Sequence, residues 1–150
     1  MFKLCVLISS LLLVLQLGAG LEFKDCGSKT GKFSQVTIEG CDTTKAECIL
    51  HRNTNVSISI DFTLAETATS VITVVHGKVL GIEIPFPLSN PNACVNSGLT
   101  CPLENNESYR YTATLSVLNS YPKVSVLVKW ELQDQNNLDI LCIEIPAKIQ

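Results

Sequence analysis

Six of the seven cysteines constrain what this chain can fold into more than any other feature of its sequence; the seventh, Cys5, lies in an N-terminal segment that we exclude from the fold. The six are Cys26, Cys41, Cys48, Cys94, Cys101 and Cys142. The second and third have six residues between them, as do the fourth and fifth, and the first and last lie near the two ends. Six thiols allow fifteen sets of pairings. Because short loops cost little to close, we expect Cys41–Cys48 and Cys94–Cys101, which leaves Cys26–Cys142.

The first twenty residues have the pattern of a secretory signal peptide. Lys3 precedes an apolar run, Leu4–Leu17, and the segment ends in small residues up to Gly20. The run is too short to span a bilayer comfortably. We therefore expect a signal peptide over residues 1–20, cleavage after Gly20, and one domain over residues 21–150. An uncleaved signal anchor is the alternative.

Export into an oxidising compartment favours disulfides over metal ligation as the role of the cysteines. Structural zinc sites favour two to four residues between ligand cysteines, whereas exported proteins favour disulfides. We therefore expect three disulfides, no metal and no cofactor. Two sequons, Asn55-Val56-Ser57 and Asn106-Glu107-Ser108, make Asn55 and Asn106 candidate glycosylation sites; unoccupied chance matches are the alternative. The net charge of −3 offers no basic patch for nucleic acid.

Alternation of apolar and polar residues dominates the rest of the chain. It predicts strands over residues 33–38, 56–64, 109–121, 124–132 and 138–149. Residues 71–84 are rich in β-branched side chains and contain Gly77 and Gly81, which predicts two strands or one bent strand. No segment carries a sustained helical stripe. Six to eight strands without helices predict an all-β fold, an antiparallel β-sandwich.

Aromatic residues gather around two strands that have long apolar faces. They are Phe86, Tyr109, Tyr111, Tyr121 and Trp130. Two splayed sheets would leave an apolar slot between them, and such a slot suits a lipid. We take Phe62, Tyr111 and Leu115 as candidate ligand contacts on those strands. An ordinary core role for the tyrosines, with their hydroxyls satisfied, is the alternative.

Several sequence motifs together resemble the Niemann-Pick type C2 proteins. These motifs are Phe23–Ser28, Val75–Gly77, Ile84–Pro87, Cys94–Pro102, Tyr121–Pro122, Trp130–Asp134 and Cys142–Pro146. They span nearly all of residues 21–150 in the order of that family. The family belongs to the ML lipid-recognition domains, which also include the group 2 mite allergens and the lipopolysaccharide coreceptors.

The resemblance implies an immunoglobulin-like sandwich of two sheets with an internal hydrophobic pocket, and the same three disulfides. In the sterol-carrying members a phenylalanine, a valine and a tyrosine line the pocket; the matching positions here are Phe86, Val117 and Tyr121. A tryptophan beside the pocket matches Trp130, for which a core role is equally expected. We also expect Cys94–Cys101 to brace a loop next to the pocket.

The match also has departures. The family has a glycosylation site near Asp61, where this chain has no asparagine, so glycan-dependent sorting to the lysosomal lumen is in doubt. Invertebrates have expanded sets of such proteins, so the cargo is a sterol or, alternatively, a fatty acid or another small apolar semiochemical.

Catalysis is not expected from the remaining polar residues. His51 and His76 are the only histidines, and no Gly-x-Ser-x-Gly motif accompanies them. Glu83, Glu131 and Glu144 alternate with apolar residues and are predicted to face solvent. We therefore do not expect an enzyme.

The sequence thus predicts a secreted, extracellular and monomeric carrier of one hydrophobic ligand. We expect it to deliver its cargo to a membrane or a lipid-transfer receptor, with Leu80 and Ile82 as an apolar rim around the pocket. The alternative is an innate-immune protein that recognises microbial lipid. A basic rim would favour that alternative, and only Lys123 and Lys129 lie near the candidate strands.

Overall fold

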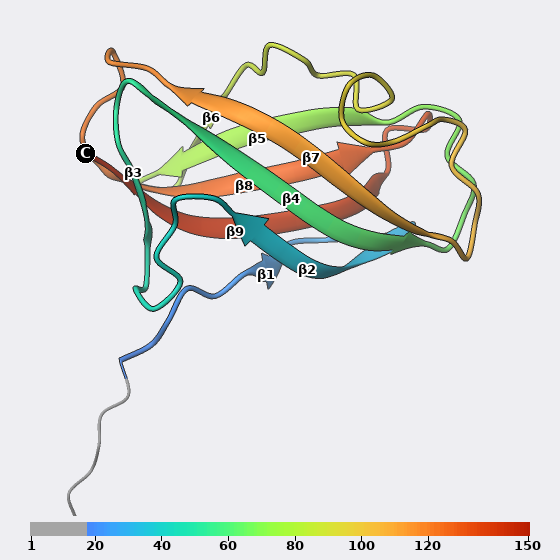
Figure 1. Cartoon of the computed structure of the whole chain (residues 1–150), viewed down its shortest axis with the longest axis horizontal. Coiled ribbons are helices and arrows are strands. Elements are labelled where there is room, and N and C mark those ends of the chain that lie inside the picture. The colour runs from blue at the N-terminus through green and yellow to red at the C-terminus, as the bar shows by residue number, and fades with distance from the viewer. Residues whose placement is uncertain (1–17) are drawn as a thin grey trace, which may run out of the picture.

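The computed structural model describes residues 18–150, and they form a sandwich of two β-sheets (Figure 1). The predicted signal peptide lies mostly outside the described residues. The strands are β1 (Lys24–Asp25), β2 (Gly31–Ile38), β3 (Cys48–Leu50), β4 (Thr54–Leu64), β5 (Ile72–Val79), β6 (Ile82–Pro85), β7 (Ser108–Val117), β8 (Ser125–Gln133) and β9 (Asp139–Ile149). Within residues 18–150 no helix has the length and hydropathy needed to cross a membrane.

The two sheets differ in size, and we call the larger one sheet A and the smaller one sheet B. Sheet A has six strands in the order β1-β9-β8-β5-β6, with β3 pairing on β9, and sheet B has the order β2-β4-β7. All pairs are antiparallel except β3 with β9. The predicted all-β sandwich is therefore confirmed.

The core forms where the apolar faces of the two sheets meet. On β4, Ile58, Ile60 and Phe62 are buried, and Ser59 and Asp61 between them point to the outer face. On β8, Trp130 and Leu132 are buried against the same core. Strand alternation places every second side chain on one face, so the predicted phase of these strands is confirmed.

Some strand boundaries differ from the sequence prediction. The chain turns between β5 and β6 at Leu80 and Gly81, which have φ values of 51° and 78°. Gly77 lies inside β5 and does not interrupt it, because it pairs with both Ile84 and Val128. Strand β7 ends at Val117 and not near residue 121. Strands β1 and β3 are too short to show alternation.

All three expected disulfides are present. Cys26–Cys142 joins the segment after β1 to the middle of β9 across 116 positions of sequence. Cys41–Cys48 and Cys94–Cys101 each close a loop with a sequence separation of seven.

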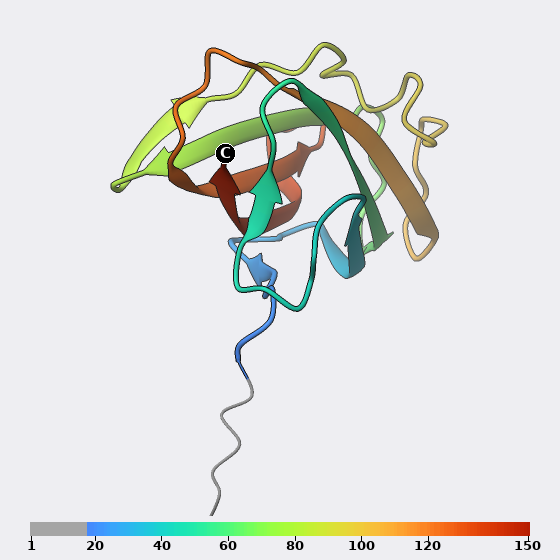
Figure 2. The same cartoon turned by 60° about the vertical axis from the view of Figure 1, so that its left-hand side comes forward.

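Figure 2 shows the β5–β6 hairpin projecting at one end of the sandwich, near the connection from β7 to β8. The candidate site lies at this end of the sandwich and is lined by residues of both segments.

Candidate ligand-binding cavity

A cavity of about 150 Å³ lies between the sheets. Its lining residues are apolar apart from Tyr121 and His76, and the imidazole of His76 is directed away from the cavity, to the outer face of the sheet, where it lies 3.9 Å from Glu131. The strand residues that enclose it include Val75 and Val79 on β5, Leu115 and Val117 on β7, and Val126 and Val128 on β8. Because both sheets contribute, the cavity is the predicted slot between them. It offers an apolar ligand a dry environment and almost no hydrogen-bonding partners.

Phe86 and Tyr121 lie together at one side of this cavity. Their ring centroids are 5.0 Å apart, with the planes tilted by 58°. The backbone N–H of Phe86 donates to the carbonyl of Val75 at 2.8 Å, which continues the pairing just beyond β6. Partial burial raises the pKa of the Tyr121 phenol, so its hydroxyl stays neutral near pH 7. The two rings thus form a tilted aromatic pair on the cavity wall.

A second, smaller cavity of about 30 Å³ adjoins the first. The two share Leu50, Leu115 and Val128 in their walls. Trp130 lines only the smaller cavity, so the structure places it beside the main cavity and buried in the core. Together the two cavities form one slot, which is narrowest where Leu50, Leu115 and Val128 separate them.

Two predicted contacts, Phe62 and Tyr111, do not line either cavity. Phe62 packs on Tyr109 with a centroid distance of 5.9 Å. The hydroxyl of Tyr111 is 2.9 Å from the hydroxyl of Thr73, and burial raises the pKa of this phenol. Both rings belong to the main core cluster of buried residues. They are part of the packed core between the sheets, in a region that neither cavity reaches.

Several lining residues were missed by sequence reasoning. They are Leu50 of β3, Val75 and Val79 of β5, Val126 and Val128 of β8, and Ile149 of β9. Alternation marks most of them as apolar and inward-facing, which is the one signal that the sequence offers for them. It does not show which inward residues meet empty space and which meet a neighbour.

The disulfide at the cavity is not the one expected there. Cys48, which is bonded to Cys41, lines the smaller cavity. Cys94 and Cys101 pack instead against the main core cluster and line neither cavity. The reason is that the loop after Pro87 runs along the edge of sheet B, where the N–H of Thr112 donates to the carbonyl of Ser97 at 2.8 Å.

Exposed apolar side chains gather near the open end of the cavity. Leu80 is 98% exposed and Ile82 is 66% exposed at the tip of the β5–β6 hairpin. Ile84 is 53% exposed and also lines the cavity. Leu118, just after β7, is 49% exposed. We call these four residues the apolar rim; the predicted pair Leu80 and Ile82 belongs to it.

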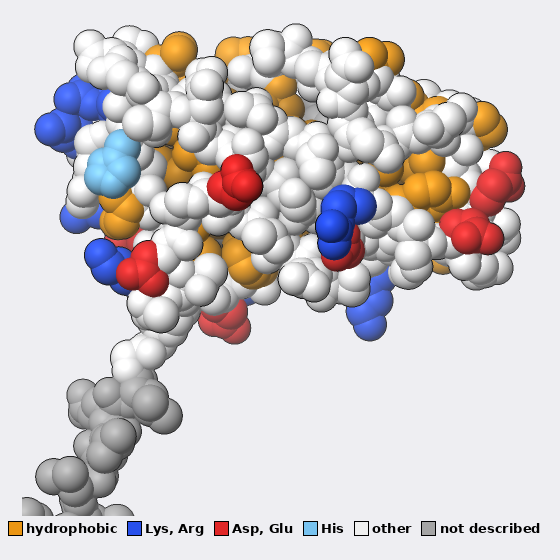
Figure 3. Space-filling model, in the orientation of Figure 1, with side chains coloured by type: hydrophobic (Ala, Val, Ile, Leu, Met, Phe, Trp, Pro, Cys, Tyr) orange, Lys and Arg blue, Asp and Glu red, His pale blue; other side chains and the backbone are white. Residues whose placement is uncertain are grey.

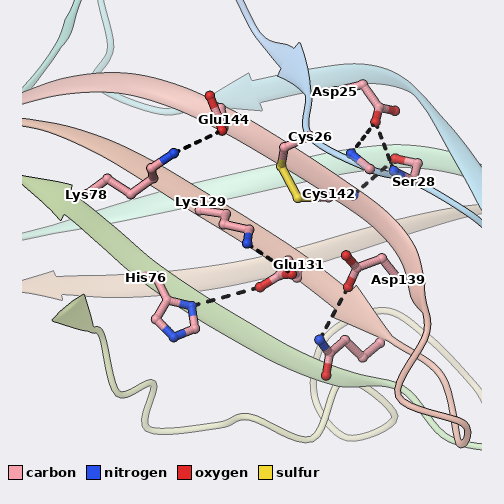
Figure 4. Close-up of a disulfide and its surroundings, with 12 residues drawn as sticks. Asp25, Cys26, Ser28, His76, Lys78, Lys129, Glu131, Asp139, Cys142 and Glu144 are labelled. Carbon is pink, nitrogen blue, oxygen red and sulfur yellow. Dashed lines mark hydrogen bonds and ion pairs between the residues drawn. A yellow bond between two sulfur atoms is a disulfide. The ribbon is translucent and has the colours of Figure 1, made fainter. Parts of the chain in front are cut away.

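The outer face of sheet A carries a network of charged side chains (Figure 4). Lys129 reaches Glu83 at 3.5 Å and Glu131 at 3.7 Å, and Glu131 also lies 3.9 Å from Nδ1 of His76. Glu131 is only 7% exposed, so its predicted solvent-facing position is wrong. Burial, together with the nearby carboxylate of Asp139, raises the pKa of Glu131.

Glu131, Asp139 and Cys142 bring potential ligand atoms within 4.8 Å of one another. The sulfur of Cys142 is bonded to Cys26 and is therefore not available as a thiolate. Two neighbouring carboxylates do not make a metal centre; burial is the main cause of the raised pKa of Glu131, and the negative charge of Asp139 adds to it.

Comparisons with known proteins identify the family of this chain. The family model described as the ML domain matches residues 20–149. The chain is 81% identical over 130 residues to NPC intracellular cholesterol transporter 2 homolog a of Drosophila melanogaster, covering 87% of this chain and 88% of that protein. It is 39% identical over 130 residues to the NPC intracellular cholesterol transporter 2 of Bos taurus, covering 87% and 85%.

A solved structure gives the same result. The Niemann-Pick type C2 protein of the Japanese carpenter ant superposes with a TM-score of 0.82 at 34% identity, covering 86% of this chain and 99% of that one. The fold and the cavity define a two-sheet sandwich of the ML class. The chain belongs to the ML domain family and, within it, to the Niemann-Pick type C2 proteins, as an invertebrate member.

Proposed function

We propose that this protein is a carrier that holds one sterol-sized apolar ligand between its two sheets and performs no chemistry on it. The observation that carries the proposal is the cavity of about 150 Å³, to which, among the described residues, Tyr121 is the one lining residue that contributes a polar side chain. Support comes from the relatives that are named cholesterol transporters. Burial of apolar ligand surface drives binding, at about 25 cal/mol per Å².

The expected affinity suits a carrier. A sterol of about 28 heavy atoms, at about −0.3 kcal/mol per atom, binds with about −8 kcal/mol, which is near micromolar. Such a ligand is retained during transport and released on contact with an acceptor. The carrier is secreted and monomeric in this proposal, with the lysosomal lumen as the alternative destination.

The slot has to widen before a sterol enters. An engineered cavity of about 150 Å³ in another protein holds benzene, and a sterol is several times larger than benzene. The Phe86–Tyr121 pair belongs to the segments at the edge of the cavity, and β6 beside it is the last strand of sheet A, where among the described residues it pairs with β5. A small outward movement of this edge strand would enlarge the slot while sheet B and the centre of sheet A stay in place.

Delivery is proposed to use the apolar rim. Leu80 and Ile82 expose their side chains beside the open end of the cavity, where they can enter a lipid surface or an apolar patch of a receptor. An apolar ligand could then leave the cavity without crossing bulk water.

A carrier of a fatty acid or semiochemical is the second candidate, and the small size of the cavity favours it. A receptor for phosphorylated microbial glycolipids is less well supported. Lys129 is engaged with Glu83 and Glu131 on the outer face of sheet A, so of the two expected basic residues only Lys123 remains near the rim.

The test is the identification of lipid bound to the protein from its native source. Organic extraction followed by mass spectrometry should give a sterol in near-equimolar amount. A Phe86→Ala variant, which removes half of the aromatic pair, should bind a fluorescent sterol at least tenfold more weakly, a change of about 1.4 kcal/mol. Recovery of a phosphorylated glycolipid in place of a sterol, or unchanged sterol binding by Phe86→Ala, would contradict the proposal.

A further inference from the structure

A polar groove lies on the outer face of sheet B, remote from the cavity. Its volume is about 570 Å³. The floor comes from outward-facing side chains of β2, β4 and β7, and one wall comes from the loop between β6 and β7. Most of its lining side chains carry a hydroxyl or an amide, and Glu39 is the only charged one. Figure 3 shows this face, which is mostly uncharged and polar.

Part of the groove is lined by a row of cross-strand residue pairs on β4 and β7. Ser59 is paired with Thr112 and Ser57 with Thr114, and all four side chains line the groove. The next pair in the row joins Asn55 to Ser116. Because these positions alternate with inward-facing residues, Asn55 lies on the same face as the groove, about 7 Å from Ser57 along the strand.

Asn55 is chemically able to carry a sugar. It is exposed, and Ser57 completes its sequon while forming part of the groove. The hydroxyl of Ser116 donates to Oδ1 of Asn55 at 2.9 Å. That bond uses the oxygen and leaves Nδ2, the atom that carries an N-linked sugar, unoccupied by it. Strand β2 ends opposite Ile58, so it does not extend beside Asn55.

The wall of the groove is held in place before any ligand arrives. The N–H of Thr112 donates to the carbonyl of Ser97 at 2.8 Å, and the side chain of Asn90 donates to the carbonyl of Val95 at 2.6 Å. The disulfide Cys94–Cys101 closes the same loop. A groove with fixed walls costs little conformational entropy when it binds a partner.

From these observations we propose that Asn55 carries an N-linked glycan whose first sugars lie in this groove. The attachment forms a bond between Nδ2 of Asn55 and C1 of the first sugar. It breaks the bond from C1 to the pyrophosphate of a lipid-linked oligosaccharide, and the lipid pyrophosphate leaves as Nδ2 loses a proton. The hydroxyls of the groove then exchange hydrogen bonds with those of the sugar. The glycan covers sheet B and leaves the apolar rim free.

The second sequon provides an internal control. Asn106 is exposed in the turn before β7, with a φ of 61°, and it does not line the groove. The hollow beside it, of about 420 Å³, includes Ser108 and the charged pair Asp61 and Arg110, and it offers three hydroxyl side chains against the ten hydroxyl or amide side chains of the groove. Comparing the two sites within one molecule removes differences in expression, folding and enzyme concentration.

The experiment uses the full chain expressed in insect cells and digested with peptide-N-glycosidase, with each site followed by mass spectrometry. In the native protein the Asn55 glycan should be released about tenfold more slowly than the Asn106 glycan, the factor that about 1.4 kcal/mol of protection gives. After reduction and denaturation the two rates should be equal. Ser59→Arg, which fills the groove, should raise the Asn55 rate to that of Asn106.

Gln35→Arg is the matched control, because Gln35 is exposed on β2 and lies outside the groove. It should leave both rates unchanged, and a thermal melt of each variant verifies that it is folded. An unoccupied Asn55, equal native rates at the two sites, or protection that survives Ser59→Arg would overturn the proposal. So would binding of free chitobiose to the fully glycosylated protein, because the groove would then be empty.

Discussion

Val117 is the single side chain whose size should control ligand entry most directly. It is 2% exposed, and it lines the main cavity at the end of β7. We expect Val117→Phe to place an aromatic ring where the ligand lies and to weaken sterol binding by at least tenfold, about 1.4 kcal/mol. Titration with a fluorescent sterol measures the effect.

Val95→Phe is the control for this substitution. Val95 is 48% exposed in the loop between β6 and β7 and does not line the cavity. The control should bind sterol like the unchanged protein. If Val117→Phe also binds normally while remaining folded, the cavity is not the ligand site.

Glu131 should make the fold more stable in mild acid. Its pKa is raised by burial and by the neighbouring Asp139, so the folded state favours the protonated form. The stabilising contribution is complete below the ordinary value of 4.5 and is lost as the pH rises through the raised value. We therefore expect Glu131→Gln to raise Tm by a few degrees at pH 7 and to have little effect near pH 4.

Asp61 should behave in the opposite way, which makes it a useful comparison. The side chain of Arg110 hydrogen-bonds to it at 2.7 Å and lowers its pKa. A lowered pKa stabilises the fold above the ordinary value of 3.8, and this contribution is lost as the pH falls. Asp61→Asn should thus lower Tm slightly at pH 7. The Glu131 interpretation fails if Glu131→Gln also lowers Tm at pH 7 and the two variants have the same pH profile.

At the scale of elements, the turn of the β5–β6 hairpin contains a leucine, Leu80, in a backbone conformation that leucine disfavours. Leu80 has a φ of 51° and is 98% exposed. Asparagine tolerates this backbone region better than leucine. We expect Leu80→Asn to keep or raise Tm while slowing sterol transfer to phospholipid vesicles several-fold. Equilibrium sterol binding should not change.

The control for the hairpin is Leu138→Asn, because Leu138 is 38% exposed in the turn between β8 and β9, away from the rim. Its transfer rate should equal that of the unchanged protein. Equal slowing by both variants would mean that general surface hydrophobicity, and not the rim, governs transfer.

The strands also show how far the sequence predicts the site. Alternation along β7 correctly assigned Tyr111, Leu115 and Val117 to the inner face, because side-chain direction follows the local backbone. It did not show that Tyr111 meets Trp130, at a centroid distance of 6.3 Å, while Leu115 meets empty space. That difference depends on the opposite sheet, and no local pattern in the chain encodes it.

Burial of Glu131 was unpredictable for the same reason. Its alternation with Trp130 and Leu132 gave the correct face of β8. The outer face of sheet A is nevertheless crowded at this position, since the side chains of His76, Lys129 and Asp139 surround the carboxylate. An outward direction does not ensure exposure when neighbouring strands contribute large polar side chains.

At the scale of the whole molecule, the disulfide expected to stabilise the fold most is not the one that lies at the cavity. Cys26–Cys142 closes a span of 116 positions, which in the chain-entropy account contributes about 5 kcal/mol, whereas each seven-position loop contributes about 2 kcal/mol. None of Cys26, Cys142, Cys94 or Cys101 lines a cavity, while Cys48 does. The largest stabilising bond is therefore remote from the site.

Paired serine substitutions test this separation. Replacing Cys26 and Cys142 should give the largest fall in Tm and, at a temperature where the variant is folded, sterol affinity within about twofold of normal, less than about 0.5 kcal/mol. Replacing Cys41 and Cys48 should cost less stability but weaken sterol binding more, because the wall at Cys48 loosens. Replacing Cys94 and Cys101 is the matched control, since its loop has the same length and does not line a cavity. Equal losses of sterol affinity in the two short-loop variants would show that Cys41–Cys48 has no special role at the cavity.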